Sequence, residues 1–157
     1  MKQLATQGDD RWAGLTTLDF NIDHKPHVVA DLERLPLPFV DAAFDEIHAY
    51  DVLEHTGAQG DWRFFFDQFA EFYRLLKPGG VFCAVTPRWD GLWAWGDPSH
   101  KRIINQGSLS FLSQRMYREG VGVTAMSDFR FYFKDDFESI YMSNEQDRFN
   151  FILRRVP

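Results

Sequence analysis

Residues 44–85 read FDEIHAYDVLEHTGAQGDWRFFFDQFAEFYRLLKPGGVFCAV, and the rest of the chain has to fit around them. Their opening, FDEIHAY (residues 44–50), is short, apolar and aromatic, which suits a buried strand. Residues 61–76 repeat apolar side chains at intervals of three and four, which predicts an amphipathic helix. A Pro-Gly-Gly turn at 78–80 ends this helix, and the apolar run 81–86 reads as a strand covered on both faces. This order predicts a right-handed strand–helix–strand crossover in mid-chain.

Composition limits the class of protein. The chain has 157 residues, of which 45% are hydrophobic and 17% aromatic, and this predicts one globular domain over residues 1–157. A net charge of −6 argues against a nucleic-acid-binding stripe. No apolar run approaches the roughly 20 residues of a membrane span, and no signal-peptide pattern opens the chain, so a cytoplasmic location is expected. The single cysteine, Cys83, excludes a disulfide framework and a thiolate metal site. The excess of phenylalanine leaves room for a homodimer surface.

Other elements are expected on both sides of the crossover. The polar turn at 144–147 lies between two alternating apolar segments, which predicts a terminal hairpin, although residues 129–133 compete for its first strand. Strand–helix alternation followed by a hairpin predicts an α/β sheet that is parallel in its body and antiparallel at one edge. The expected elements are strands at 2–5, 16–20 and 28–31, a helix at 109–117 capped by Ser108, and hairpin strands at 137–141 and 149–153.

In such sheets ligands bind beyond the carboxyl ends of the strands. The residues that directly follow each expected strand are therefore the candidates for a binding site. They are Thr6, Gln7 and Gly8; Asp19; Asp31; Tyr50 and Asp51; and Thr86, Pro87 and Arg88.

These strand-end residues, together with FDEIHAYDVLEH and LLKPGG, resemble the class I S-adenosylmethionine-dependent methyltransferases, in particular short variants of that family. The resemblance covers most of the chain. It implies a three-layer Rossmann-like α/β fold with a mostly parallel sheet, an antiparallel C-terminal hairpin and a reduced helix after the first strand. It also implies S-adenosylmethionine as cofactor and methyltransferase activity.

The resemblance further implies roles for individual residues. Asp19 would hold the ribose hydroxyls, because a carboxylate offers acceptors to two hydroxyl donors; the alternative is a solvated loop carboxylate. Asp31 would accept from the adenine amino group and the Leu32 N–H would meet a ring nitrogen, or else Asp31 caps a turn. Tyr50 and Asp51 would line the methionine end of the cofactor, although Tyr50 could equally pack in the core.

The first loop departs from the family pattern. The family normally has G-x-G there, which lets bare backbone approach the cofactor, and Thr6, Gln7 and Gly8 stand at the matching positions. These three residues are expected to contact the cofactor, but a Cβ at Thr6 narrows the space. A catalytically inactive binding or assembly module with a methyltransferase-like fold is therefore the alternative function. A nucleotide-binding oxidoreductase is a third reading, disfavoured because the loop lacks its glycine fingerprint.

Two histidines are candidates for the acceptor side of a methyl transfer. His55 follows the strand at 44–50 closely, and His100 lies in a long irregular loop at 87–105, where Asp97 could orient it. The alternatives are a histidine bonded to backbone and a turn around Pro98 closed by an Asp97 side-chain bond. Glu54 is a further candidate base, expected to be solvated.

The same loop carries Trp89, Trp93 and Trp95, which are expected to pack in the core or as a lid; if exposed, they would form a surface for a planar substrate or a partner. His24 and His27 lie near Asp23, but no third strong ligand accompanies them, so no metal site is expected. The acceptor would be a small molecule or a protein side chain.

Overall fold

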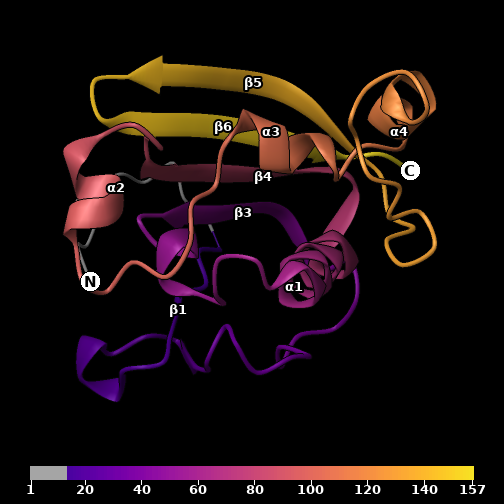
Figure 1. Ribbon diagram of the computed structural model, residues 1–157. Coiled ribbons are helices and arrows are strands. Elements are labelled where there is room, and N and C mark those ends of the chain that lie inside the picture. The colour runs from indigo at the N-terminus through magenta and orange to yellow at the C-terminus, as the bar shows by residue number, and fades with distance from the viewer. Residues whose placement is uncertain (1–13) are drawn as a thin grey trace.

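The computed structural model describes residues 14–157 (Figure 1). Within these residues, six strands lie in two sheets. The strands are β1 (Leu18–Asp19), β2 (Val28–Val29), β3 (Phe44–Tyr50), β4 (Leu76–Pro87), β5 (Phe137–Glu145) and β6 (Arg148–Arg155). The helices are α1 (Trp62–Leu75), α2 (Leu92–Gly96), α3 (Gln106–Ser110) and α4 (Gln114–Gly120), with short 3-10 turns η1 (Ile22–His24) and η2 (Leu53–His55).

The larger sheet has the strand order β3-β4-β6-β5. The pair β3–β4 is parallel, whereas β6 runs antiparallel to both β4 and β5. The short strands β1 and β2 form a separate parallel pair. The expected α/β class, its parallel strands and its antiparallel C-terminal hairpin are therefore confirmed. The strand expected at 2–5 and the reduced helix after it lie outside the described residues.

The predicted crossover β3–α1–β4 is confirmed, and its helix forms the core. Asp61 caps α1 by accepting a hydrogen bond from the Phe64 N–H at 3.1 Å. The aromatic face of α1 packs on the sheet: the Phe72 ring stacks on Phe82 of β4 with centroids 4.6 Å apart, and Phe69 meets Phe137 of β5 edge-on. Phe69 and Phe82 are fully buried. One apolar helix face thus packs against residues of two strands, β4 and β5.

The Pro-Gly-Gly segment differs from its prediction, because β4 begins at Leu76, directly after α1, rather than after the glycines. Leu76 pairs with Phe44 and Val81 with Glu46, so the residues between form a bulge. A Cβ on Gly80 would lie 2.8 Å from the Asp45 carbonyl oxygen. Glycine is therefore required where the bulge approaches β3.

The single helix predicted at 109–117 is wrong, because two short helices replace it. Asn105 and Ser108 form a capping box in which each side chain bonds the other's backbone N–H, so α3 starts earlier than expected. The chain then turns at 111–113, and α4 starts after Ser113. Asp136 accepts from the Gln114 N–H at 2.8 Å, which ties the start of α4 to the segment before β5.

The terminal hairpin is confirmed, and its strands are longer than predicted. The turn between β5 and β6 includes Gln146, whose φ of 53° allows the tight reversal. The competing segment 129–133 is not a strand. Its Phe133 ring instead stacks on Phe66 of α1 with centroids 5.2 Å apart. None of the helices within residues 14–157 has the length and apolar character that a membrane crossing requires.

Replacing Phe69 by alanine should lower the free energy of unfolding by about 3–5 kcal/mol, because a fully buried aromatic ring leaves a cavity beneath the sheet. Urea denaturation followed by circular dichroism measures the change. Phe20, which is 77% exposed, provides the matched control, and Phe20→Ala should change stability by less than about 1 kcal/mol. Equal losses in the two variants would contradict this assignment of the core.

Candidate functional site

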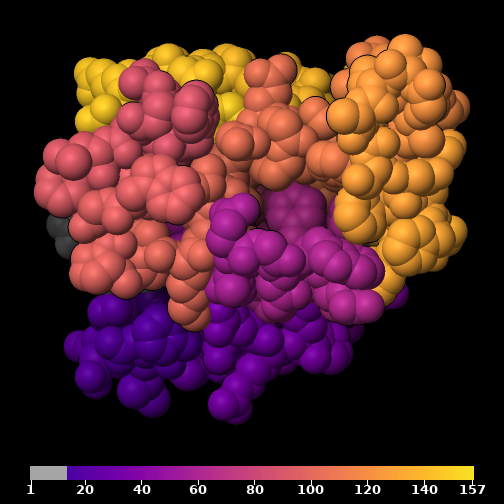
Figure 2. Space-filling view, in the orientation of Figure 1, coloured from indigo at the N-terminus to yellow at the C-terminus, as the bar shows by residue number. Residues whose placement is uncertain are grey.

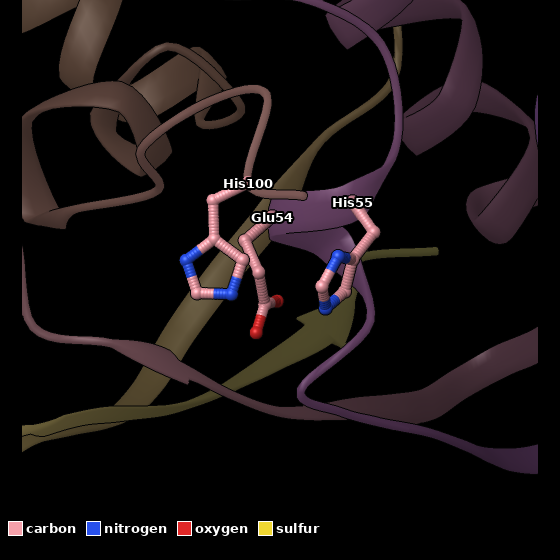
Figure 3. Close-up of side chains that lie close together, drawn as sticks. All are labelled: Glu54, His55 and His100. Carbon is pink, nitrogen blue, oxygen red and sulfur yellow. The ribbon is translucent and has the colours of Figure 1, made fainter. Parts of the chain in front are cut away.

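Three side chains that can act as acids, bases or metal ligands converge just beyond the carboxyl end of β3. Glu54 and His55 belong to η2, and His100 comes from the loop that follows α2. Their potential ligand atoms all lie within 4.8 Å of one another. Figure 3 shows the Glu54 carboxylate between the two imidazole rings, whose centroids are 4.8 Å apart. We call this group the Glu54–His55–His100 cluster.

Backbone hydrogen bonds bring the two segments of this cluster together. The Glu54 carbonyl oxygen accepts from the Lys101 N–H at 2.7 Å and from the Arg102 N–H at 3.3 Å. These bonds join η2 to the segment immediately after His100. The position of His100 beside Glu54 is therefore set by the main chain and not by contacts between side chains alone.

The Arg102 side chain strengthens this connection from within the protein. It is only 5% exposed and donates to the Leu53 carbonyl at 3.0 Å and to the Thr56 hydroxyl at 3.0 Å. It also donates to the Gln68 amide oxygen on α1. Burial lowers the pKa of Arg102 to about 10. The guanidinium thus joins the loop, η2 and α1 into one polar network.

Glu54 is buried, which corrects the expectation of a solvated carboxylate. Its exposure is 2%, because η2 turns it under the loop. Both carboxylate oxygens lack a hydrogen-bond partner within the described part of the chain. Burial, together with the charge of Asp51, raises the pKa of Glu54 to about 7. Such a carboxyl group can accept or release a proton near neutral pH.

The two predicted histidines are brought together, and each retains a free ring nitrogen. His55 Nδ1 lies 3.3 Å from the Ser99 carbonyl oxygen. His100 Nε2 lies 3.8 Å from the Asp97 carboxylate, and its Nδ1 is buried with no hydrogen-bond partner among residues 14–157. Asp97 also closes the turn considered as the alternative, accepting from the Ser99 N–H at 2.8 Å and hydroxyl at 2.6 Å. These bonds from Ser99 lower the pKa of Asp97.

Asp19 lies at the end of β1, 6% exposed, so it is not the solvated loop carboxylate considered as an alternative. One oxygen accepts from the Asn21 N–H and the other from His24 Nδ1, both at 2.9 Å. Burial pushes the pKa of Asp19 upward, but the hydrogen bonds from Asn21 and His24 outweigh it, and the pKa lies below its usual value. His27, in contrast, accepts from the Thr17 N–H at 3.0 Å.

Asp31 follows β2 and closes a turn, because its carboxylate accepts from the Glu33 N–H at 2.9 Å. Its side chain remains 43% exposed, so acceptor positions are still open to a ligand. Leu32, next to it, packs against the core cluster. Glu33 reaches across to the loop that carries His100 and accepts from Lys101 Nζ at 2.8 Å. The segment after β2 and the His100 loop are thereby connected.

Tyr50 and Asp51 end β3. Tyr50 is half-buried, its hydroxyl lies 2.6 Å from His48 Nδ1, and burial raises its pKa. Asp51 has a φ of 52° and pairs with Arg148 of β6. One Asp51 oxygen is buried without a partner among the described residues, as is the Thr86 hydroxyl near the end of β4. Thr6, Gln7 and Gly8 lie outside the part of the chain that the structure describes.

The three tryptophans are not packed, so the expectation of core or lid packing is wrong. Trp89, Trp93 and Trp95 are 55%, 59% and 70% exposed. The short helix α2 holds only Ala94 in a buried position, and the Trp95 indole N–H donates to the Trp89 carbonyl at 2.9 Å. In Figure 2 the salmon-coloured segment around α2 forms the left edge of the visible face. The alternative, an exposed aromatic surface, is what the structure shows.

Sequence reasoning missed the polar network that supports the site. Arg102 and Thr56 occupy loop positions in the sequence, and nothing in their spacing separates them from solvated residues. The burial of Gln68 could have been predicted from the sequence. It lies three residues after Phe65 and four before Phe72, at the border of the apolar face of α1. A polar residue at such a position must find a buried partner.

These residues can be compared with the hydrogen-bond partners that a nucleoside cofactor requires. Asp31 retains open acceptors, and Asp51 and Thr86 present unpartnered buried oxygens near the ends of β3 and β4. These atoms are suited to hydroxyl, amino or ammonium donors of a ligand. Asp19 fits less freely, because each of its oxygens already accepts one bond. A carboxylate still offers about four acceptor positions, so two remain.

Glu54→Gln should change the pH dependence of stability. The glutamic acid holds its proton up to about pH 7 when folded but only to 4.5 when unfolded, so ionisation favours unfolding as the pH rises. The contribution of the protonated Glu54 to the free energy of unfolding is fully present below pH 4.5 and is lost as the pH rises through 7. Glutamine cannot ionise; between pH 5 and 8 the variant should therefore gain about 2 kcal/mol relative to the original protein. Urea unfolding in EDTA measures this difference. Glu119→Gln, at a side chain that is 60% exposed, should show no such trend.

Comparisons with known proteins show which proteins the chain resembles. Residues 10–84, slightly less than half of the chain, match the family model described as Methyltransferase domain. A sterol 24-C-methyltransferase from Eremothecium gossypii is 29% identical over 109 residues, which are 67% of this chain and 26% of that protein. The chain therefore spans about a quarter of that relative's length.

Solved structures share the fold. A SAM-dependent methyltransferase from Archaeoglobus fulgidus aligns with a TM-score of 0.54 at 15% identity, over 88% of this chain and 74% of its own. Another, from Methanosarcina mazei, aligns with a TM-score of 0.50 at 15% identity, over 81% of this chain and 65% of its own. The family match implies S-adenosylmethionine (SAM) as cofactor. The resemblance to the class I SAM-dependent methyltransferases is thereby confirmed, and the chain has their Rossmann-like fold.

Proposed function

We propose that this protein is a SAM-dependent methyltransferase whose acceptor, a small molecule or a protein side chain, reacts at the Glu54–His55–His100 cluster. The observation that carries the proposal is the position of the cluster. It lies beyond the carboxyl end of β3, the edge of an α/β sheet where ligands bind. The family match over residues 10–84 supplies the reaction class.

Cofactor binding is assigned to the strand-end residues. Asp19 would bind the ribose hydroxyls through its two remaining acceptor positions, with His24 holding the carboxylate in place. Asp31 and the Leu32 N–H would bind the adenine. Tyr50 and Asp51 would line the methionine end, where the unpartnered Asp51 oxygen can accept from an ammonium group. Thr6, Gln7 and Gly8 are assigned to the same pocket on the sequence pattern alone.

The bound cofactor supplies an electrophilic methyl group on a sulfonium. The protein aligns the acceptor with that methyl group, and alignment can lower the barrier by up to about 7–11 kcal/mol. An acceptor that arrives protonated also needs a base. His100 Nε2, which faces Glu54 in Figure 3, and His55 Nε2 can take that proton, and Asp97 positions the loop that carries His100. Glu54, with its pKa near 7, can store the proton between the two rings.

An inactive binding module is the second candidate, and the exposed tryptophans of the α2 segment favour it. Trp93 and Trp95, with Leu92 at 72% exposure, form an apolar surface suited to a partner. This function does not require SAM. Cofactor binding therefore separates the two candidates.

S-adenosylhomocysteine, the product of the reaction, should stabilise the protein if the proposal is correct. At 100 times its dissociation constant it adds about 2.7 kcal/mol, which for a domain of this size is a rise in Tm of about 5–10 °C. Thermal unfolding with and without the ligand measures the shift. Asp19→Ala should abolish the shift while Asp23→Ala, in the same loop, retains it. No shift in the original protein at millimolar ligand would favour the binding module, and a full shift in Asp19→Ala would remove the ribose assignment.

A further inference from the structure

We propose that the Glu54–His55–His100 cluster binds one divalent transition-metal cation. The three potential ligand atoms lie within 4.8 Å of one another, and Figure 3 shows the carboxylate directed between the rings. Ligands around tetrahedral zinc stand roughly 3.4 Å apart, given metal–ligand distances of about 2.0–2.1 Å. Small side-chain rotations are enough to reach that geometry.

Each histidine is held in a way that leaves one nitrogen for a metal. The Ser99 carbonyl can only accept, so the His55 nitrogen 3.3 Å from it carries the proton and Nε2 keeps its lone pair. For His100, the nitrogen that faces the Glu54 carboxylate in Figure 3 is Nε2, which lies 3.8 Å from the Asp97 carboxylate, too far for a hydrogen bond. Metal-binding histidines commonly have the arrangement seen at His55, with the second nitrogen on a carbonyl.

The cluster also contains unsatisfied buried polar atoms. Both Glu54 oxygens are buried, and neither has a hydrogen-bond partner within residues 14–157. An unpaired buried polar atom is unfavourable, so this carboxylate calls for a partner. Its oxygens, when ionised, are electron-pair donors with no hydrogen to give. A cation held by Glu54, His55 and His100 would satisfy them.

The backbone prepares the site before any ligand arrives. The Glu54 carbonyl holds Lys101 and Arg102, and the Arg102 side chain is fixed to η2 and α1. The two segments that supply the ligands are therefore joined at their main chains. Little conformational freedom remains to be lost on binding, which favours affinity.

The donor set selects the class of cation. Two neutral imidazoles and one carboxylate suit zinc and other first-row transition metals, whereas calcium and magnesium prefer oxygen ligands throughout. Three protein ligands leave at least one coordination position open, as in catalytic zinc sites. An acceptor oxygen or a water would occupy that position. With a cation bound, the imidazoles would no longer be free to take a proton, and the cation would instead lower the pKa of the oxygen that it holds. The inference rests on the geometry of the cluster and not on the proposed methyl transfer.

Isothermal titration of Zn²⁺ into the EDTA-treated and dialysed full chain tests the proposal. One equivalent should bind, and Glu54→Gln and His100→Asn should each weaken the affinity at least about tenfold, since even changes to residues that only hydrogen-bond a metal ligand cost about 10–100-fold. His27→Asn removes an imidazole outside the cluster and should leave the affinity within about twofold. Absence of binding at about 100 µM Zn²⁺, a concentration far above the dissociation constants of structural zinc sites, or equal affinity in all variants, would overturn the proposal.

Cobalt provides a second readout that does not depend on affinity alone. Co²⁺ bound by two imidazoles and a carboxylate should give visible d–d absorption that His55→Asn and His100→Asn lose and His27→Asn retains. Circular dichroism establishes that each variant is folded; if His100→Asn does not fold, the partly exposed His55 gives the deciding variant. Zinc binding without a response to S-adenosylhomocysteine would overturn only the methyltransferase proposal, and the reverse result only the metal site.

Discussion

The buried guanidinium of Arg102 holds the functional region together. It is one of the few charged groups that the fold takes out of water, and desolvation alone would make its position unfavourable. Its hydrogen bonds to the Leu53 carbonyl, Thr56 and Gln68 offset that cost, and they connect η2, α1 and the loop after α2. Removing one partner would leave the others unsatisfied, so these segments keep a fixed arrangement.

This network explains why His100 lies beside Glu54 although many residues separate them in the chain. The Lys101 and Arg102 N–H groups both donate to the Glu54 carbonyl, so the main chains of the two segments are joined next to His100. The earlier part of the loop, which includes α2, is attached to the core much more weakly, because Ala94 is the only buried residue of α2. The loop therefore has a loosely held first part and a firmly held second part.

The crossover was predictable because its physics is local. Apolar spacing in 61–76, the cap at Asp61 and the apolar runs on either side all indicate the same arrangement, and the structure has it. The helix break at 111–113 was not predictable from spacing, because the Asn105–Ser108 capping box and the Gln114–Asp136 bond decide it. The bulge at Gly80 likewise depends on contact with β3.

For the site, His55, His100 and Asp97 were candidates because of their positions after strands, and the structure brings the two histidines together. The predictions that Glu54 is solvated and that the tryptophans are packed were wrong. Burial of Glu54 follows from main-chain bonds to residues 101 and 102, which sequence spacing does not reveal. Exposure of the tryptophans follows from the shortness of α2, which offers one small buried side chain to the core and no apolar stripe.

The contrast between the two halves of the 88–105 loop has an evolutionary consequence. Its second half is fastened by Arg102 and cannot vary without loss of the buried network, whereas the first half, with α2, has almost no such obligation. Insertions, deletions and exchanges of aromatic side chains there would leave the buried network undisturbed. The exposed surface around α2 can therefore change while the Glu54–His55–His100 cluster stays in place, in keeping with the tolerance of loops for change.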